Sequence, residues 1–216
     1  GAPGEGVIHC SGRRGSSGGG SHGGGSEARC RLDDDRSAGR AGRRRRMTGP
    51  VGCGLGGIDS LDQALRALPG VGAADMRLAR AEIAAATGAL TDHQPLHDQT
   101  RAVHAAGFLR PGDGIVMVRE DVGRHNALDK LIGALAQAGI DPAGGAIALT
   151  SRVSVEMVQK AAMAGCPVIV AASAPTALAL RQADAAGITL AAFARDGRFD
   201  LYSHPQRIET GASDVA

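Results

Sequence analysis

The sequence predicts an α/β fold for the C-terminal half of the chain, and three observations support this class. Beyond Pro111, short apolar segments alternate with longer amphipathic segments. The short segments have the length and residue types of buried strands, and the longer ones repeat apolar residues at the period of a helix. Hydrophobic residues make up 43% of the chain, enough for a sizeable core. Strands and helices that alternate in this way form a largely parallel sheet with helices on both faces.

The predicted strands are built from Ala, Val, Ile and Leu, because aromatic residues are only 2% of the chain. A turn with the sequence RDGR separates the last two strands. The predicted strands span residues 114–118, 145–150, 167–172, 188–194 and 199–203.

The predicted helices follow these strands, and each ends in glycine, which commonly terminates helices. They span residues 125–139, 154–165 and 176–187. Two further amphipathic segments, 58–68 and 74–90, precede the alternation. Asp59 or Ser60 is the candidate N-cap of the first one.

The first part of the chain has a different character. Residues 1–46 are rich in Gly, Ser and Arg and offer little apolar surface, so we expect this segment to be irregular or disordered. Its run Arg43–Arg46 could contact RNA, although a solvated basic run is the commoner explanation. We therefore predict three parts: a low-complexity segment at 1–46, a cysteine loop with helical residues at 47–99, and an α/β core at 100–210.

Composition and charge exclude several functional classes. A formal net charge of +2 predicts no strong electrostatic field, and the chain has no Trp and one Tyr. Stacking platforms for single-stranded nucleic acid are therefore nearly absent, and we expect no nucleic-acid partner. No apolar run approaches the roughly 20 residues of a membrane span, and the N-terminus lacks a signal-peptide pattern, so we expect no membrane association.

The four cysteines are widely spaced, at Cys10, Cys30, Cys53 and Cys166. No pair has the spacing of metal ligands, so we predict no metal site, and a reducing cytoplasm is the simplest location. Cys166 opens an apolar strand, which predicts a core position. Cys53 instead lies among glycines in CGLGG, a flexible loop where a reactive thiol could work.

Polar clusters follow the predicted strands, at the place where α/β sheets bind their ligands. They occupy residues 119–126, 150–154, 173–176 and 195–198. Several lead into a helix N-terminus, whose free N–H groups favour an anion. Loops in such folds are commonly polar, so one cluster alone means little. Several clusters with arginines on one edge favour a phosphorylated ligand such as a nucleotide.

The densest cluster is REDVGRHNALDK, residues 119–130, in which eight of twelve side chains are charged, amide or imidazole. This density predicts a hydrogen-bonded network. His125, between Arg124 and Asn126, is either a donor to a ligand or an ordinary loop histidine.

Three familiar motifs do not fit the chain. GCGLGG at 52–57 matches G-x-G-x-x-G, but no apolar strand precedes it, as a dinucleotide-binding turn requires. No P-loop sequence occurs. Both halves of the zinc-deaminase signature, H-x-E and P-C-x-x-C, are also absent from the sequence.

Four motifs in the same order resemble the formate dehydrogenase accessory sulfurtransferases, the FdhD family. They are REDVGRHNALDKLIG, TSRVSVEMVQKAAMAG, SAPTALA and GITLAAFARDGRFDLYSHPQRI. The resemblance covers about Thr100 to Ile208, and VGCGLGGIDSLDQAL is similar to the family's cysteine loop and following helix. Before about Met47 the similarity is faint.

The resemblance implies a cytidine-deaminase-like, three-layer α/β/α core without a zinc site, in a cytoplasmic homodimer. It implies a sulfurtransferase that accepts sulfur from a cysteine desulfurase as a cysteine persulfide. The sulfur then passes to the molybdenum bis(guanine dinucleotide) cofactor, a bound substrate, for formate dehydrogenase. GDP is an analogue of the nucleotide part of that substrate.

The resemblance also implies the site residues. The family's cofactor-binding stretch matches FARDGR, which is Phe193, Ala194, Arg195, Asp196, Gly197 and Arg198. Arg195 and Arg198 would meet phosphate, and backbone N–H groups of the turn could help. The polar clusters add Arg124, His125, Arg152 and Ser173 to the predicted cofactor-binding residues.

Cys53 is the predicted catalytic thiol that carries sulfur. The upstream arginines and a downstream helix N-terminus would lower its pKa, and the neighbouring glycines would let the loop swing. The family's loop reads C-G-x-C-G, and Gly56 stands here in place of the second cysteine. The family usually has a pair of glycines before VHAA, and Arg101-Ala102 stand in their place here. Two possibilities therefore stay open: a slower sulfurtransferase, or a module that binds guanine nucleotide without transferring sulfur.

Overall fold

The structure is a computed structural model that describes residues 9–13, 27–31, 68–72 and 76–209. The chain divides into two compact units, residues 1–59 and 60–216. In the first unit, β1 (His9–Arg13) pairs antiparallel with β2 (Glu27–Arg31). These two strands lie in the segment predicted to be irregular. That the segment is disordered as a whole stays a prediction.

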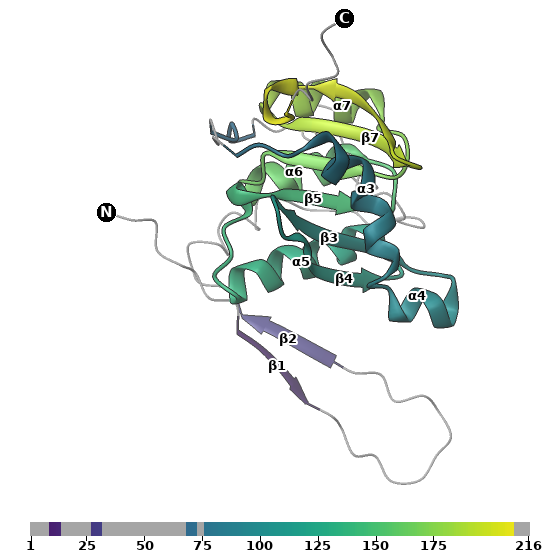
Figure 1. The fold of residues 1–216 in the computed structure, drawn as a ribbon. Helices are drawn as coiled ribbons and strands as arrows, with labels where there is room; N and C mark the ends of the chain where they lie inside the picture. Colours follow the sequence, from purple (N-terminus) through teal and green to yellow (C-terminus); the bar gives the residue numbers. More distant parts are fainter. Residues whose placement is uncertain (1–8, 14–26, 32–67, 73–75, 210–216) are drawn as a thin grey trace, which may run out of the picture. The chain divides into compact units, whose positions relative to one another are not determined.

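The second unit contains a six-stranded sheet in the order β4-β3-β5-β6-β7-β8 (Figure 1). Only β5–β6 and β6–β7 are parallel pairs, and the other three pairs are antiparallel. The strands are β3 (His104–Arg110), β4 (Gly114–Asp121), β5 (Ala146–Leu149), β6 (Val168–Ala171), β7 (Thr189–Arg195) and β8 (Arg198–Ser203).

The α/β class is confirmed, but the prediction of a mostly parallel sheet is wrong. Short turns join β3 to β4 and β7 to β8, and a short connection can only make an antiparallel pair. The sequence interpretation also missed β3, whose Ala, Ala and Gly are poor strand formers. Gly107 allows a close approach here, because a Cβ atom at that position would lie 2.3 Å from Leu90 Cδ2.

Helices cover both faces of the sheet. They are α3 (Arg80–Thr91), α4 (Pro95–Thr100), α5 (Arg124–Gln137), α6 (Val155–Met163) and α7 (Ala177–Ala185), with short 3₁₀ turns η1 (Pro142–Gly144) and η2 (Pro205–Arg207). The three predicted helices of the core are confirmed, and each boundary agrees within two residues. The predicted helix at 74–90 begins only at Arg80, because Leu78 forms a β-bridge with Ile208. The predicted helix at 58–68 falls almost wholly outside the described residues.

Two apolar clusters fill the space between these layers. The larger one packs α5, α6 and α7 against one face of the sheet and includes Phe108 and Cys166. The smaller one packs α3 against the other face. The α/β unit is therefore a three-layer α/β/α core, and α3 from the predicted segment 47–99 supplies one of its layers. No helix in the described part of the chain is long and apolar enough to cross a membrane.

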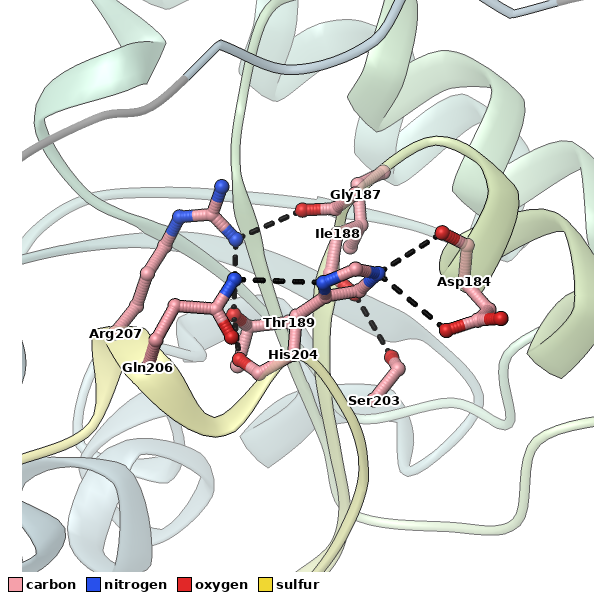
Figure 2. Close-up of polar contacts among 8 residues, drawn as sticks. All are labelled: Asp184, Gly187, Ile188, Thr189, Ser203, His204, Gln206 and Arg207. Atoms are coloured by element: carbon pink, nitrogen blue, oxygen red, sulfur yellow. Dashed lines mark hydrogen bonds and ion pairs between the residues drawn. The ribbon is translucent and has the colours of Figure 1, made fainter.

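A buried arginine ties the end of the chain to the start of β7. Arg207 is 5% exposed, and its Nη1 atom donates to the carbonyl of Gly187 at 2.7 Å and to Thr189 Oγ1 at 3.1 Å (Figure 2). Its Nη2 atom donates to the carbonyl of Gly72 at 3.3 Å. Thr189 in turn donates to the carbonyl of His204 at 2.6 Å. The segment after β8 is thereby fixed to the α7–β7 junction.

Candidate functional site

The sheet topology brings the predicted polar clusters to one edge. β5, β6 and β7 are parallel and end at the same side, which we call the carboxyl edge. β4 also ends there, because His104 at the start of β3 pairs with Asp121 and β3 runs antiparallel to β5. Residues 119–126, 150–154, 173–176 and 195–198 therefore all lie along this edge, as the sequence predicts.

The FARDGR stretch forms the end of β7 and the turn into β8. Asp196 and Gly197 have φ values of 52° and 74°, which fits the two-residue hairpin turn in which both central residues have positive φ. The β7–β8 register shifts between Ala192 and Arg195, and Phe193 within this irregular stretch has φ 51°. Irregularities of this kind re-aim side chains at the end of a strand.

Two cavities flank this turn. One has a volume of about 560 Å³ and is lined by Phe193, Arg195, Asp196, Arg198, Phe199 and Asp200. The other, of about 330 Å³, is lined by Arg80, Ala81, Ala84 and residues 197–200. The guanidinium of Arg80 lies 5.0 Å from the centre of the Phe199 ring. Three arginine side chains are therefore available for an anionic ligand.

The predicted residues of this stretch differ in what they can contact. Arg195 and Arg198 are exposed, and Phe193 is half-buried. Ala194 is fully buried beneath α3, and its carbonyl accepts a hydrogen bond from the Thr87 hydroxyl. Its side chain therefore cannot reach a ligand.

The cluster after β4 is a hydrogen-bonded network, as its density predicts. Asp121 accepts from the Gly123 N–H at 2.8 Å and from Asn126 Nδ2 at 3.2 Å, and it pairs with Lys130 at 2.6 Å. The bonds from Lys130 and Gly123 hold the pKa of Asp121 below its usual value. Glu120 accepts from the N–H groups of Leu96 and His97 and fixes the start of α4.

His125 lies in the first turn of α5 and faces the first turn of α6. Its Nε2 atom lies 3.8 Å from an Oε atom of Glu156. Burial and the charge of Arg124 lower the pKa of His125, although Glu156 opposes the shift. Burial, Arg124 and His97 also lower the pKa of His104. Both imidazoles are therefore neutral at neutral pH.

A third cavity at the carboxyl edge has a volume of about 470 Å³ and is lined by Gln94, His97, Arg101, Ala102, Val103, His104 and Thr150. None of the described residues that line it carries a carboxylate. Sequence reasoning did not select this cavity, because its lining comes from α4, β3 and the end of β5. The order of motifs along the chain does not show that these elements meet.

The remaining predicted residues lie on the loops after β5 and β6. Arg152 is exposed and Ser173 is half-buried. The two loops are joined, because Val153 donates to the carbonyl of Ala174 at 3.1 Å and accepts from Thr176 at 2.9 Å. Arg152 and Ser173 therefore lie on the carboxyl edge, between the start of α6 and the FARDGR turn.

The cysteines differ sharply in what the structure shows. Cys53 lies outside the described residues, so its role stays a prediction. Cys166 is fully buried, and burial raises its pKa to about 12. It is an inert core residue, as predicted. The described part of the chain holds no group of three or more His, Cys, Asp or Glu residues that could bind a metal ion.

Comparison with known proteins identifies relatives of the chain. The sequence profile of the FdhD/NarQ family matches residues 21–209. A sulfur carrier protein FdhD from Agrobacterium fabrum is 52% identical over 186 residues, which are 86% of this chain and 69% of that protein. The protein of the same name from Brucella abortus is 53% identical over 166 residues, which are 77% of this chain and 62% of that protein.

A solved structure is similar as well. The crystal structure of a proposed formate dehydrogenase accessory protein from Desulfotalea psychrophila matches with a TM-score of 0.61 and 32% identity. The match covers 68% of this chain and 60% of that one. The chain thus spans about two thirds of the length of these relatives.

Proposed function

The chain belongs to the FdhD/NarQ family, and from that premise we propose that it is a sulfurtransferase acting on the molybdenum bis(guanine dinucleotide) cofactor. In this proposal Cys53 accepts sulfur from a cysteine desulfurase, and the carboxyl edge binds the cofactor as substrate. The sulfurated cofactor then serves formate dehydrogenase. The names of the relatives, sulfur carrier protein FdhD, support the general activity.

The observation that carries the proposal is the arginine-lined FARDGR turn at the carboxyl edge. Arg195 and Arg198 line the larger cavity, and Arg80 joins Arg198 at the smaller one. Guanidinium groups form paired hydrogen bonds to phosphate, and the cofactor carries phosphates in its nucleotide part. Both cavities are lined by residues of the turn, whose backbone N–H groups would add further donors.

The proposed sulfur step is an exchange between two cysteines. The Cys53 thiolate attacks the outer sulfur of a desulfurase persulfide, a new S–S bond forms on Cys53, and the desulfurase cysteine leaves as thiolate. The cofactor then takes this outer sulfur atom: the S–S bond breaks, Cys53 leaves as thiolate, and the molybdenum centre of the substrate supplies the two electrons that bring the sulfur to the sulfide level. One cysteine suffices for both events. Gly56 in place of the second loop cysteine therefore slows sulfur transfer or makes the persulfide easier to over-oxidise, but it does not abolish transfer.

A binding module that transfers no sulfur is the second candidate, and Gly56 is the observation that favours it. Such a protein would bind guanine nucleotide at the carboxyl edge but form no persulfide. We further propose that the chain acts as a homodimer in the cytoplasm. Light scattering at known concentration tests the dimer.

Mass spectrometry after incubation with a cysteine desulfurase and cysteine distinguishes the two candidates. We expect one additional sulfur atom on Cys53, and its loss in Cys53→Ala. Cys10→Ala and Cys30→Ala are the matched controls and should keep the modification. Sulfur that is absent from Cys53, or found on another cysteine, would contradict sulfur transfer by this thiol.

A further inference from the structure

Four neighbouring side chains hold all the buried polar side-chain atoms that lack a hydrogen-bond partner in the described part of the chain. The atoms are Arg124 Nε, His125 Nε2, Ser154 Oγ, and both Glu156 carboxylate oxygens, Oε1 and Oε2. All four residues lie at the starts of α5 and α6, on the carboxyl edge. Buried polar groups are nearly always paired, so a cluster of unpaired ones needs an explanation.

Contacts within the cluster do not supply one. Glu156 is 9% exposed, and its closest basic neighbour, His125 Nε2, lies 3.8 Å away, beyond hydrogen-bond distance. Ser154 is the N-cap residue of α6, yet its hydroxyl makes no capping bond. A buried carboxylate without donors is costly for the folded chain, so the ligand-free arrangement is incomplete.

The unpaired atoms define the chemistry of the missing group. Glu156 offers two adjacent acceptors, so the group must present two adjacent N–H donors. Arg124 Nε is always a donor, and the charges of Arg124 and Glu156 both act on His125. The group must therefore also present an acceptor on the side of its donors that faces Arg124. An edge with the order donor, donor, acceptor is the 2-amino-4-oxopyrimidine edge, which guanine and pterin share.

We propose that Glu156 binds the 2-amino-4-oxopyrimidine edge of the substrate, with Arg124 and Ser154 donating to the adjacent oxo group. This inference rests on the proposed function, because it assumes a ligand with a guanine or pterin ring. The cluster is near the surface, since the side chains of His125 and Glu156 are 20% and 12% exposed.

The spacing along the carboxyl edge fits a single ligand. α6 follows β5, and the FARDGR turn follows β7, two strands further along the sheet. Neighbouring strands are about 4.8 Å apart, so the two places are separated by about 10 Å. This is comparable with the reach of a nucleoside diphosphate from its base to its terminal phosphate. Arg152 and Ser173 lie on the loops between them.

Titration calorimetry with three probes tests the proposal: GDP, IDP, which lacks the 2-amino group, and 6-methylpterin. We expect wild-type protein to bind GDP at least about tenfold more tightly than IDP, because one charge-assisted hydrogen bond is lost in IDP. Glu156→Gln should remove this preference. Glu209→Gln, an exposed glutamate at the end of the unit, is the matched control and should keep it.

The pterin arm identifies the ring that Glu156 binds. If Glu156→Gln weakens the binding of 6-methylpterin and leaves the affinity for GDP unchanged, the ring that Glu156 binds is the pterin. If the reverse holds, it is the guanine. If affinity for neither probe depends on Glu156, or if wild type binds neither, the proposal is overturned. Should Glu156→Gln fail to fold, Glu156→Asp keeps the charge, shortens the side chain and gives the same readout.

The same titrations separate this inference from the phosphate site. Arg195→Ala should weaken the binding of GDP and of IDP equally, because both nucleotides carry the diphosphate. A loss of GDP affinity in Arg195→Ala, with no preference for GDP over IDP and no effect of Glu156→Gln on 6-methylpterin binding, would overturn the role of Glu156 alone. A preference that depends on Glu156, with no effect of Arg195→Ala, would overturn the phosphate placement alone. Persulfide formation on Cys53 reports sulfur transfer independently of both.

Discussion

Arg207 and Glu156 are both charged side chains buried in the α/β unit, at opposite edges of its sheet. Arg207 lies at the edge where β6 and β7 begin, and it donates hydrogen bonds to Gly187, Thr189 and Gly72 (Figure 2). Glu156 lies at the carboxyl edge, and neither of its carboxylate oxygens has a hydrogen-bond partner. The same fold thus completes its polar bonding at one edge and leaves it incomplete at the other.

The two edges therefore differ in whether their buried polar groups have hydrogen-bond partners. A completed set such as that of Arg207 stabilises the folded state, because each donor and acceptor replaces the water it lost. An incomplete set costs stability and persists where a ligand supplies the missing partners. Predictions that change one edge at a time should therefore separate stability from binding.

The largest expected effect is on stability, in Arg207→Ala. Removing the guanidinium leaves the buried Thr189 hydroxyl and the half-buried carbonyl of Gly187 without this donor. We expect the free energy of unfolding to fall by about 2–4 kcal/mol. Urea denaturation measures it. The affinity of the remaining folded protein for GDP should be unchanged, and a parallel loss of affinity would contradict the separation of the two edges.

The next effect is on binding, in Arg195→Ala. Loss of a charge-assisted contact to phosphate should weaken GDP binding by about 1.5–3 kcal/mol with little change in unfolding free energy. Arg110→Ala is the matched control, because Arg110 ends β3 at the other edge, its side chain is 42% exposed, and it pairs with Asp113. Equal GDP affinities in the two variants would show that the phosphate binds elsewhere.

A smaller effect of opposite sign is expected for Glu156→Gln without ligand. The substitution keeps the shape of the side chain and removes an unpaired buried charge, so the free energy of unfolding should rise by about 1 kcal/mol. Thermal denaturation of the ligand-free protein measures it. A clear loss of stability would mean that Glu156 has a structural partner, and the contrast with Arg207 would then fail.

The smallest effect is the pH dependence from His104 and His125. Their pKa values are lowered in the folded state, so the unfolded chain takes up protons more readily. Their contribution is therefore complete above the ordinary histidine pKa of about 6.5 and is lost as the pH falls through and below it. Around His125, Arg124 and Lys160 favour this shift, and Glu156 and Asp129 oppose it.

Denaturation between about pH 5 and pH 8 tests this, with the double variant His104→Gln/His125→Gln as the comparison. The variant should show a flatter dependence over that window. If wild type gains stability on acidification there, the sign of both shifts is wrong.

The contrast between the edges also explains what the sequence could predict. The strands β5 to β8 and the helices α5 to α7 follow from apolar period and glycine stops, because burial imposes those patterns directly. The network around Asp121 follows from polar density after a strand. β3 was missed because its small residues serve a close contact with α3, and Gly107 is the clearest example.

The site was only partly predictable for a related reason. The polar clusters mark the carboxyl edge, because strand ends in an α/β sheet converge there. The sequence pattern does not indicate a ligand contact for Glu156, since a charged residue in an amphipathic helix is ordinarily assigned to solvent. Its lack of partners emerges only when α5 and α6 are placed side by side. Cys53 is identified by its loop and the resemblance alone.

Complementation tests the proposal that this chain carries sulfur on Cys53 to the cofactor that formate dehydrogenase needs. Wild type, Cys53→Ala and Gly56→Cys would be expressed in a bacterial strain that lacks its own accessory protein, and formate dehydrogenase activity would be measured. We predict activity with wild type, equal or higher activity with Gly56→Cys, and none with Cys53→Ala. Activity restored equally by Cys53→Ala, or not restored by wild type, would contradict the claim.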